Sequence, residues 1–332
     1  MRTAELPWLE TPTLDLDLDL PPTERFGSIP PEALSAGREL LDAILEGLPP
    51  RTEALADLAR LRTVGRFDAE IEALADAIGV PWRGVMLANL IYDLAVASMG
   101  CSTVALATAD GPVLARNMDW SPEDVLARSS FLVRCRRRGR LAFASAGWPG
   151  AVGVVSGMSG RGFAVVLNAV LGPEGKSLAG YPVLLHLRRV VEDAMGFDDA
   201  VEMLARPPLV VSALFTLVGV ENHQRVVIER SPTRFALRRP AGDEPLLTTN
   251  DYRLLFAPTA SDHGEIYRTT CSRYDALGRL LRKTRASRTV SDAELLYVLG
   301  DAEVRQSITA QHVIFRPASG DMGLWVPRDL AA

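Results

Sequence analysis

Residues 101–120 read CSTVALATADGPVLARNMDW, a stretch that predicts a β-hairpin. Two runs with the composition of β-strands flank Asp110-Gly111, a dipeptide that favours a tight hairpin turn. Upstream, residues 31–100 carry apolar residues at helical spacing, so the pattern changes from helical to β at Cys101. A cysteine at such a junction is a candidate for chemistry, although a buried structural cysteine is the alternative.

Polar residues in the second strand strengthen this candidate. Burying Arg116 and Asp119 costs much free energy unless they form a simple ion pair or serve a site. A two-residue loop would place Cys101 opposite Trp120 with Arg116 on the Cys101 face, and a three-residue loop would place Cys101 opposite Asp119. Both registers remain open, and in each the polar cluster lies at the Cys101 end. Gly100, small and flexible, precedes the cysteine.

The rest of the chain predicts layers of helices and strands. Runs of strands followed by runs of helices are typical of an α+β fold, here two antiparallel sheets covered by helices. The alternation LDLDLDL (14–20) predicts an edge strand, although an extended arm wrapped on the body is the alternative. Helices are expected over 68–79, capped by Asp68 and ended by Gly79, over 82–97, over 180–195, over 198–205, capped by Asp198, and from Ser291, where Glu294 completes a capping box. Strands are expected over 129–135, 140–146, 151–157, 162–169, 212–220, 225–230 and 234–238, and in the closing segments TAQHVIFRP and MGLWVP.

Composition restricts the function. The 332 residues carry a net charge of −5, which argues against a nucleic-acid partner, and the basic run 134–140 is expected to be a solvated hairpin. Three widely spaced cysteines (Cys101, Cys135 and Cys271) predict neither a disulfide framework nor a metal site, and no cofactor motif occurs. The chain shows no signal-peptide core and no apolar run of membrane-spanning length, so no membrane span and a cytoplasmic setting are expected.

The hairpin stretch resembles the start of the mature catalytic chain in the acid ceramidase and N-acylethanolamine acid amidase family. These enzymes are N-terminal-nucleophile (Ntn) cysteine hydrolases, and the penicillin acyl-transferases are more distant cousins. The resemblance continues in order over nearly the whole chain, through LDLDLPPTERF, GVMLANLIYDL, FASAGWPGAVGVVSGMSGRGFAVVLNAV, LLTTNDY and LLYVLGDAEVRQSITAQHVIFRPASGDMGLWV.

The resemblance implies a four-layer αββα sandwich and an activity that depends on self-cleavage. Cleavage between Gly100 and Cys101 would divide the chain into an α subunit, residues 1–100, and a catalytic β subunit, residues 101–332, which remain associated. The freed α-amine of Cys101 would act as general base for the thiol. The substrate would be a linear N-acyl amide, such as an N-acylethanolamine, a ceramide or a related lipid amide, cleaved through a thioester on Cys101.

The resemblance also assigns roles to individual residues. Arg116 and Asp119 match the family's R-N-x-D, where the aspartate accepts hydrogen bonds from the α-amine or the arginine. Asn250 matches an asparagine that stabilises the tetrahedral oxyanion, although it could instead cap a turn. A second family arginine corresponds to Arg268 or Arg273, of which Arg273 is preferred.

Three further residues are candidate substrate contacts, and some features depart from the family. Trp120, Trp148 and Asn168 lie in suitable segments, although a core or strand-end position is favoured over an acyl-pocket wall for the two tryptophans. The hairpin is one residue shorter than the family's, and 168–170 read Asn-Ala-Val where the family has Asn-Glu-Arg. Two other functions remain open: an acyltransferase on the same scaffold, and an unprocessed, non-catalytic scaffold.

Overall fold

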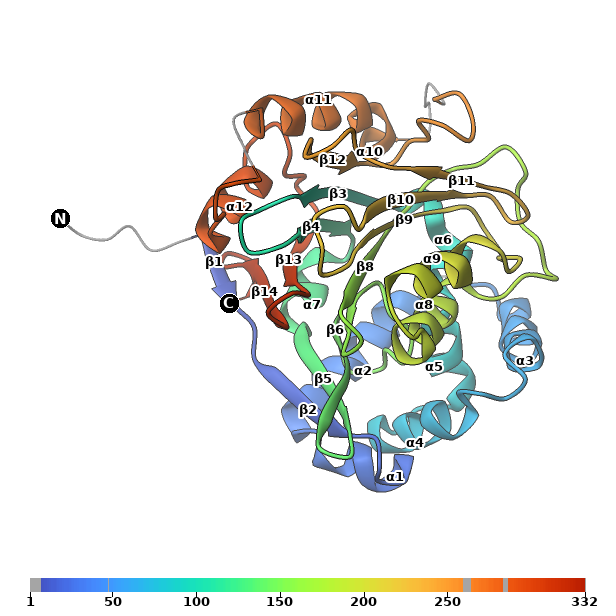
Figure 1. Cartoon of the computed structure of the whole chain (residues 1–332). Helices are drawn as coiled ribbons and strands as arrows, with labels where there is room; N and C mark the ends of the chain where they lie inside the picture. The colour runs from blue at the N-terminus through green and yellow to red at the C-terminus, as the bar shows by residue number, and fades with distance from the viewer. Residues whose placement is uncertain (1–6, 47, 259–263, 283–285, 332) are drawn as a thin grey trace.

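Two β-sheets stacked face to face form the centre of the protein (Figure 1). The computed structural model describes residues 7–46, 48–258, 264–282 and 286–331. One sheet has six strands in the order β1-β14-β13-β4-β3-β12, and the other has eight in the order β11-β10-β9-β8-β7-β6-β5-β2. The strands are β1 (Trp8–Glu10), β2 (Thr13–Asp17), β3 (Met99–Leu106), β4 (Val113–Trp120), β5 (Phe131–Arg137), β6 (Arg140–Gly147), β7 (Ser156–Ser159), β8 (Phe163–Asn168), β9 (Ala213–Val218), β10 (Arg225–Arg230), β11 (Phe235–Arg238), β12 (Leu246–Thr248), β13 (Thr309–Arg316) and β14 (Asp321–Pro327).

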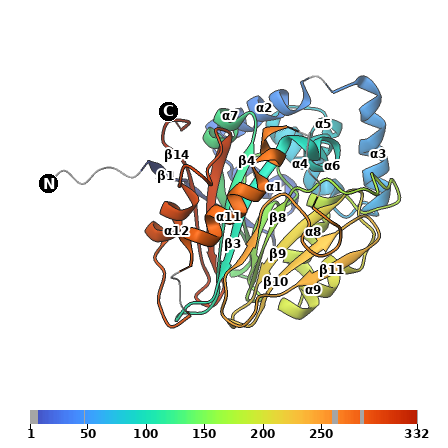
Figure 2. The ribbon, with the colours of Figure 1, turned by 90° about the horizontal axis from the view of Figure 1, so that it is seen from above.

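Helices cover the outer face of each sheet, which gives the order α, β, β, α (Figure 2). The helices α11 (Thr270–Leu280) and α12 (Asp292–Leu299) pack on the six-stranded sheet in one hydrophobic cluster. The helices α8 (Val183–Asp193) and α9 (Phe197–Ala205) pack on the eight-stranded sheet. A third cluster, which includes Leu114 and Val166, fills the space between the sheets. The predicted α+β class and the four-layer arrangement are therefore confirmed.

Helices make up most of the described residues between Pro22 and Ser98, and the segment before them reaches both sheets. Strand β2, from the Leu-Asp alternation, pairs in parallel with β5 at one edge of the eight-stranded sheet. Strand β1 pairs antiparallel with β14 at the edge of the six-stranded sheet. The helices of this segment are α1 (Pro22–Arg25), η1 (Phe26–Ser28), α2 (Pro31–Leu45), η2 (Pro50–Thr52), α3 (Glu53–Arg62), α4 (Asp68–Ile78), α5 (Trp82–Asn89), α6 (Ile91–Ala95) and η3 (Val96–Ser98), and the remaining short helices are α7 (Glu123–Arg128) and α10 (Glu265–Arg268).

The register of the β3–β4 hairpin differs from both predictions. Cys101 lies opposite Met118, and neither a two-residue nor a three-residue loop produces this pairing. The turn is longer because it closes over Thr108–Gly111, where the N–H of Gly111 donates to the carbonyl of Thr108 (3.3 Å). The Thr108 hydroxyl donates in turn to the carbonyl of Gly111 (2.6 Å). Arg116 nevertheless shares the Cys101 face, because it pairs with Thr103, two residues along the strand.

Several local predictions are wrong for identifiable reasons. Asp68 begins α4 but does not cap it, because Phe67 takes the N-cap position, whereas Gly79 ends the helix at a φ of 78° as predicted. Asp198 lies inside the first turn of α9, whose N-cap is Gly196. The helix expected over 82–97 is divided into α5, α6 and η3. The strand expected over 151–157 starts only at Ser156, and helices α7, α10 and α11 were not predicted.

Other local predictions are confirmed. Ser291 and Glu294 form the predicted capping box at the start of α12. The basic run lies in the β5–β6 hairpin, where Arg134 and Arg136 both pair with Asp15 of β2. Arg137 of the same run pairs with Glu192, so acidic side chains balance part of the positive charge of this hairpin.

Candidate active site

The Gly100–Cys101 peptide bond lies inside β3, which runs without interruption through both residues. A Cβ added at Gly100 would lie 2.7 Å from Cγ2 of Ile266 and 3.3 Å from Cβ and Oδ2 of Asp119. A larger residue would fit there only if the Ile266 side chain shifted. Crowding by side chains therefore favours a glycine at this position.

On the face between the sheets, the Cys101 thiol meets Arg116. The Nη2 of Arg116 donates to the Sγ of Cys101 at 2.8 Å, and Nη1 donates to the hydroxyl of Ser156 on β7. The Sγ also lies 3.6 Å from the carbonyl of Leu167 on β8. Both Cys101 and Arg116 are 2% exposed. Within the part of the chain that the structure describes, the buried Nε of Arg116 has no hydrogen-bond partner, so one N–H remains available to a substrate.

On the opposite face, Arg273 of α11 holds the backbone of Cys101. Its Nη1 donates to the carbonyl of Cys101 (2.7 Å) and to the hydroxyl of Ser102 (2.9 Å). Burial lowers the pKa of Arg273, and the nearby carboxylate of Asp119 opposes this effect. A guanidinium retains its proton under such conditions. The structure therefore brings Arg273 to the site, whereas Arg268 is exposed on α10.

Asp119 also lies on this second face, opposite Gly100 in the hairpin. Its Oδ2 is 4.0 Å from Nη1 of Arg273 and has no hydrogen-bond partner among the described residues. Its Oδ1 accepts from the hydroxyl of Thr309 on β13 at 2.6 Å. Burial raises the pKa of Asp119, partly opposed by Arg273 and Thr309. Asp119 and Arg116 thus point away from each other across the strand, and the simple ion pair considered from the sequence is absent from this site.

Asn250 connects the two halves of the site through the nitrogen of Cys101. Its Oδ1 accepts from the N–H of Cys101 (3.1 Å) and from Nη2 of Arg273 (2.8 Å). Its Nδ2 donates to the carbonyl of Ala169 (2.8 Å), which fixes the orientation of the amide. In this arrangement Asn250 holds the Cys101 nitrogen through Oδ1, and the oxyanion role that the resemblance implies for its amide stays a prediction.

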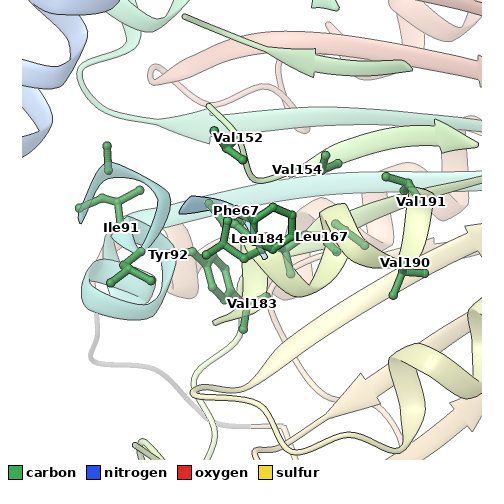
Figure 3. Packing of buried hydrophobic residues seen from close by; sticks show 14 of the residues in the cluster. Phe67, Ile91, Tyr92, Val152, Val154, Leu167, Val183, Leu184, Val190 and Val191 are labelled. Atoms are coloured by element: carbon green, nitrogen blue, oxygen red, sulfur yellow. The ribbon is translucent and has the colours of Figure 1, made fainter. Parts of the chain in front are cut away.

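An apolar cavity adjoins the thiol. Its free volume is about 20 Å³, room for about one water molecule. Trp120 lines it, as do Ile91 and Tyr92 of α6, Leu167 of β8 and Leu184 of α8. Figure 3 shows how these last four side chains, from three separate elements, converge. Ile91 and Tyr92 could not be predicted as part of this site, because an apolar residue on a buried helix has no sequence feature that shows it faces a cavity.

Two predicted substrate contacts lie outside this cavity lining. Trp148 stacks at a tilt on Trp120, with 5.8 Å between ring centroids. Asn168 uses all its polar atoms within the protein: its Oδ1 accepts from Thr103 (2.8 Å), and its Nδ2 donates to the carbonyls of Thr248 (3.2 Å) and Thr249 (3.1 Å). Asn168 therefore fastens the segment that carries Asn250, and its role as a substrate contact stays a prediction.

The described residues also bear on metal and membrane binding. They contain no group of three or more His, Cys, Asp and Glu side chains placed to hold a metal ion. None of the helices that the structure describes is both long and apolar enough to cross a bilayer. The two buried histidines, His186 and His312, have structural partners, and burial lowers the pKa of each to about 3.

Known proteins are similar to this chain in sequence and in fold. Residues 106–306 match the family described as acyl-coenzyme A:6-aminopenicillanic acid acyl-transferase. A probable acid ceramidase of Caenorhabditis elegans is 25% identical over 297 residues, which cover 75% of this chain and 72% of that protein. The N-acylethanolamine-hydrolyzing acid amidase of Oryctolagus cuniculus is 27% identical over 178 residues, which cover 50% of this chain and 48% of the relative. The predicted resemblance to the acid ceramidase and acid amidase family is thus confirmed.

The fold agrees with a solved relative. The structure of the Caenorhabditis elegans N-acylethanolamine-hydrolyzing acid amidase ortholog superposes with a TM-score of 0.55 at 18% identity. The match covers 66% of this chain and 93% of that chain. At 18% identity this similarity establishes the Ntn-hydrolase fold and does not extend to the chemistry of the site.

Proposed function

The chain belongs to the acyl-coenzyme A:6-aminopenicillanic acid acyl-transferase family, and we propose that it is an amide hydrolase activated by cleavage of its own Gly100–Cys101 bond. The proposal rests on one observation: the sulfur, the nitrogen and the carbonyl of Cys101 each contact a different polar side chain. Arg116 contacts the Sγ of Cys101, Asn250 its nitrogen and Arg273 its carbonyl. A structural cysteine needs none of these partners, whereas an N-terminal nucleophile needs both its sulfur and its nitrogen positioned.

Self-cleavage would begin with attack of the Cys101 sulfur on the carbonyl carbon of Gly100. The C–N bond breaks, the acyl group of Gly100 passes to sulfur as a thioester, and the nitrogen of Cys101 takes up a proton to become an amine. Water then hydrolyses the thioester, which gives a carboxylate on Gly100 and a free thiol on Cys101. The Arg116 guanidinium, 2.8 Å from the sulfur, is placed to stabilise negative charge that develops around the reacting atoms.

Substrate hydrolysis would repeat these steps on an external amide. The α-amine of Cys101, with an ordinary pKa of about 7.7–8.0, is suited to accept the thiol proton and pass it to the leaving amine. Asn250 already accepts from this nitrogen, and the unpaired Oδ2 of Asp119 offers a second acceptor nearby. The unpaired Nε of Arg116 is the donor we assign to the developing oxyanion.

The substrate we propose is a linear amide with an apolar acyl chain. The cavity beside the sulfur is bordered by Ile91, Trp120, Leu167 and Leu184, which favour hydrocarbon over a charged group. The relatives are named for acid ceramidase and N-acylethanolamine-hydrolyzing activity, and both names imply N-acyl lipids. Because the free volume is only about 20 Å³, the uncleaved chain must open before an acyl chain can enter.

The two products of cleavage, residues 1–100 and 101–332, would stay together. The first fragment supplies an edge strand to each sheet, β1 beside β14 and β2 beside β5. It also buries Leu40, Ile71 and Val85 in the same hydrophobic cluster as α8. Separation would expose this apolar surface and two sheet edges to water.

The test is intact-mass spectrometry of the purified chain over time and over a series of pH values. We expect two fragments, residues 1–100 and 101–332, that elute together from a sizing column, and amide hydrolysis that appears with them. Cys101→Ala should remain whole and inactive, while Cys271→Ala, at an exposed cysteine, is the matched control and should cleave normally. A wild-type chain that hydrolyses N-acyl amides while it remains uncut would overturn the proposal.

The family description itself supports a second candidate, acyl transfer to an amine. The thioester on Cys101 would then be released by an amine instead of water. Incubation with an N-acyl amide and a competing amine separates the two functions by product. Free acid as the main product supports the hydrolase, and an amine-dependent yield of new amide supports the transferase.

A further inference from the structure

A β-bulge in β13 lies directly beside the candidate active site. Gln311 pairs with Met118 and Thr309 pairs with Asp119, so Ala310 is an extra residue on β13. In regular pairing, side chains alternate, and Thr309 would share the face of Gln311 and point between the sheets. The extra residue moves Thr309 to the opposite face, where its hydroxyl contacts the carboxylate of Asp119.

The direction of the Thr309 hydrogen bond is determined by its second partner. The N–H of Gln306 donates to the Thr309 Oγ1 at 3.0 Å. The hydroxyl therefore has its single proton free for the Oδ1 of Asp119, 2.6 Å away. With Oδ1 engaged, the carboxylate presents Oδ2 next to Gly100, at 3.3 Å from the Cβ position of that glycine.

We infer that Thr309 is a positioning residue that orients the Asp119 carboxylate toward the nitrogen of the bond to be cut and, afterwards, toward the amine of Cys101. This inference rests on the proposed function. The chain of contacts runs from the N–H of Gln306 through the Thr309 hydroxyl to Oδ1, and leaves Oδ2 as the free acceptor. Neither Thr309 nor Gln306 contacts the sulfur, so Thr309 acts only through Asp119.

Each group around Asp119 contributes differently to its charge. Arg273 of α11, Arg116 of β4 and Arg305, which precedes β13, each favour the carboxylate through their charge, and burial disfavours it. Thr309 favours it through its hydrogen bond. Loss of the Thr309 hydroxyl should therefore move the protonation of Asp119 to higher pH, an effect that a purely structural threonine would not have.

The test compares Thr309→Val, which keeps the shape but lacks the hydroxyl, with Thr309→Ser, which retains it. We expect Thr309→Val to slow both self-cleavage and kcat for amide hydrolysis by roughly 10- to 100-fold, the usual effect of a hydrogen bond to a charged group. The acidic limb of its kcat profile should move to higher pH. Thr309→Ser should restore rate and profile, and Thr63→Val, which removes another buried hydroxyl far from the site, should change neither.

The outcomes separate this inference from the proposed function. A wild-type chain that neither cleaves nor hydrolyses overturns the function itself. If wild type cleaves, and Thr309→Val matches it in rate and pH profile, then only the role of Thr309 is wrong. If Thr309→Val and Thr309→Ser are equally slow with an unshifted profile, the hydroxyl is not the cause and the inference fails; urea unfolding of each variant shows whether it is folded.

Discussion

The two faces of the β3–β4 hairpin carry different chemistry. The face between the sheets presents the Cys101 sulfur and Arg116 to an apolar cavity. The face toward α11 presents Asp119 with Arg273 and the hydroxyls of Ser102 and Thr309. The Gly100–Cys101 bond lies in the strand between them. In the mechanism we propose, one face would activate the nucleophile and bind the acyl chain, while the other would position the backbone and the nitrogen.

The largest effect should come from the face that holds the sulfur. We expect Arg116→Lys to lower kcat for amide hydrolysis by roughly 10²- to 10³-fold, because a lysine cannot contact both Cys101 and Ser156 or replace the free Nε. Arg206→Lys, at a mostly exposed arginine, is the control. Steady-state kinetics on a cleaved sample decide the matter, and a rate within about threefold of wild type would exclude Arg116 from the chemistry.

A smaller effect, with a different signature, should come from the face toward α11. We expect Arg273→Lys to slow self-cleavage by roughly 10- to 100-fold, because a lysine cannot reproduce the bonds to Cys101, Ser102 and Asn250 together. Arg279→Lys, on the exposed side of the same helix, controls for the helix itself. Time courses by intact mass would contradict this assignment if both variants cleaved as fast as wild type.

The smallest effect concerns stability, and its sign should be opposite to that on activity. Because burial raises the pKa of Asp119, the folded chain binds this proton more tightly than the unfolded chain. Stability is therefore lost as pH rises through the folded pKa, and Asp119→Asn should abolish that loss. At neutral pH we expect Asp119→Asn to be inactive yet more stable than the parent chain, because the raised pKa means that the charged carboxylate lowers stability even beside Arg273.

Urea unfolding at several pH values measures this difference. Both chains should carry Cys101→Ala, so that neither is cut and each unfolds as one chain. The advantage of the asparagine should grow from acidic to neutral pH. If the difference in free energy of unfolding does not change with pH, or if Asp119→Asn is the less stable chain, then burial does not disfavour the charged carboxylate.

Much of the fold could be predicted from periodicity and caps. The alternation in LDLDLDL indicated an edge strand, and Ser291 with Glu294 indicated the start of α12. The hairpin register could not be predicted, because the Thr108 turn is also held by Asn222, far along the chain. Helix α11 was missed because its sequence, TCSRYDALGRL, has few apolar residues and buries an arginine.

The residues of the candidate site also divide into those that could be predicted from the sequence and those that could not. Arg116, Asp119, Asn250 and Arg273 could be named from local motifs that resemble a family. Thr309 could not, because its contact depends on a bulge, and a one-residue insertion in a strand has no distinct sequence pattern. Side chains that meet through tertiary packing of separate elements are not encoded by any one of those elements.

The crowding at Gly100 has a consequence for the direction of the reaction. The proposed cut would turn one neutral linkage into an amine and a carboxylate at a buried site. The amine would have acceptors in Asn250 and Asp119, but the space beside Gly100, which would carry the new carboxylate, is bounded by Asp119 and the methyl group of Ile266. Like charges and hydrocarbon make this place hostile to an anion. We therefore expect the new chain end to be expelled into solvent, which makes ligation of the ends unfavourable and leaves the cut irreversible; faster hydrogen exchange at residues 96–100 after cleavage would report the expulsion.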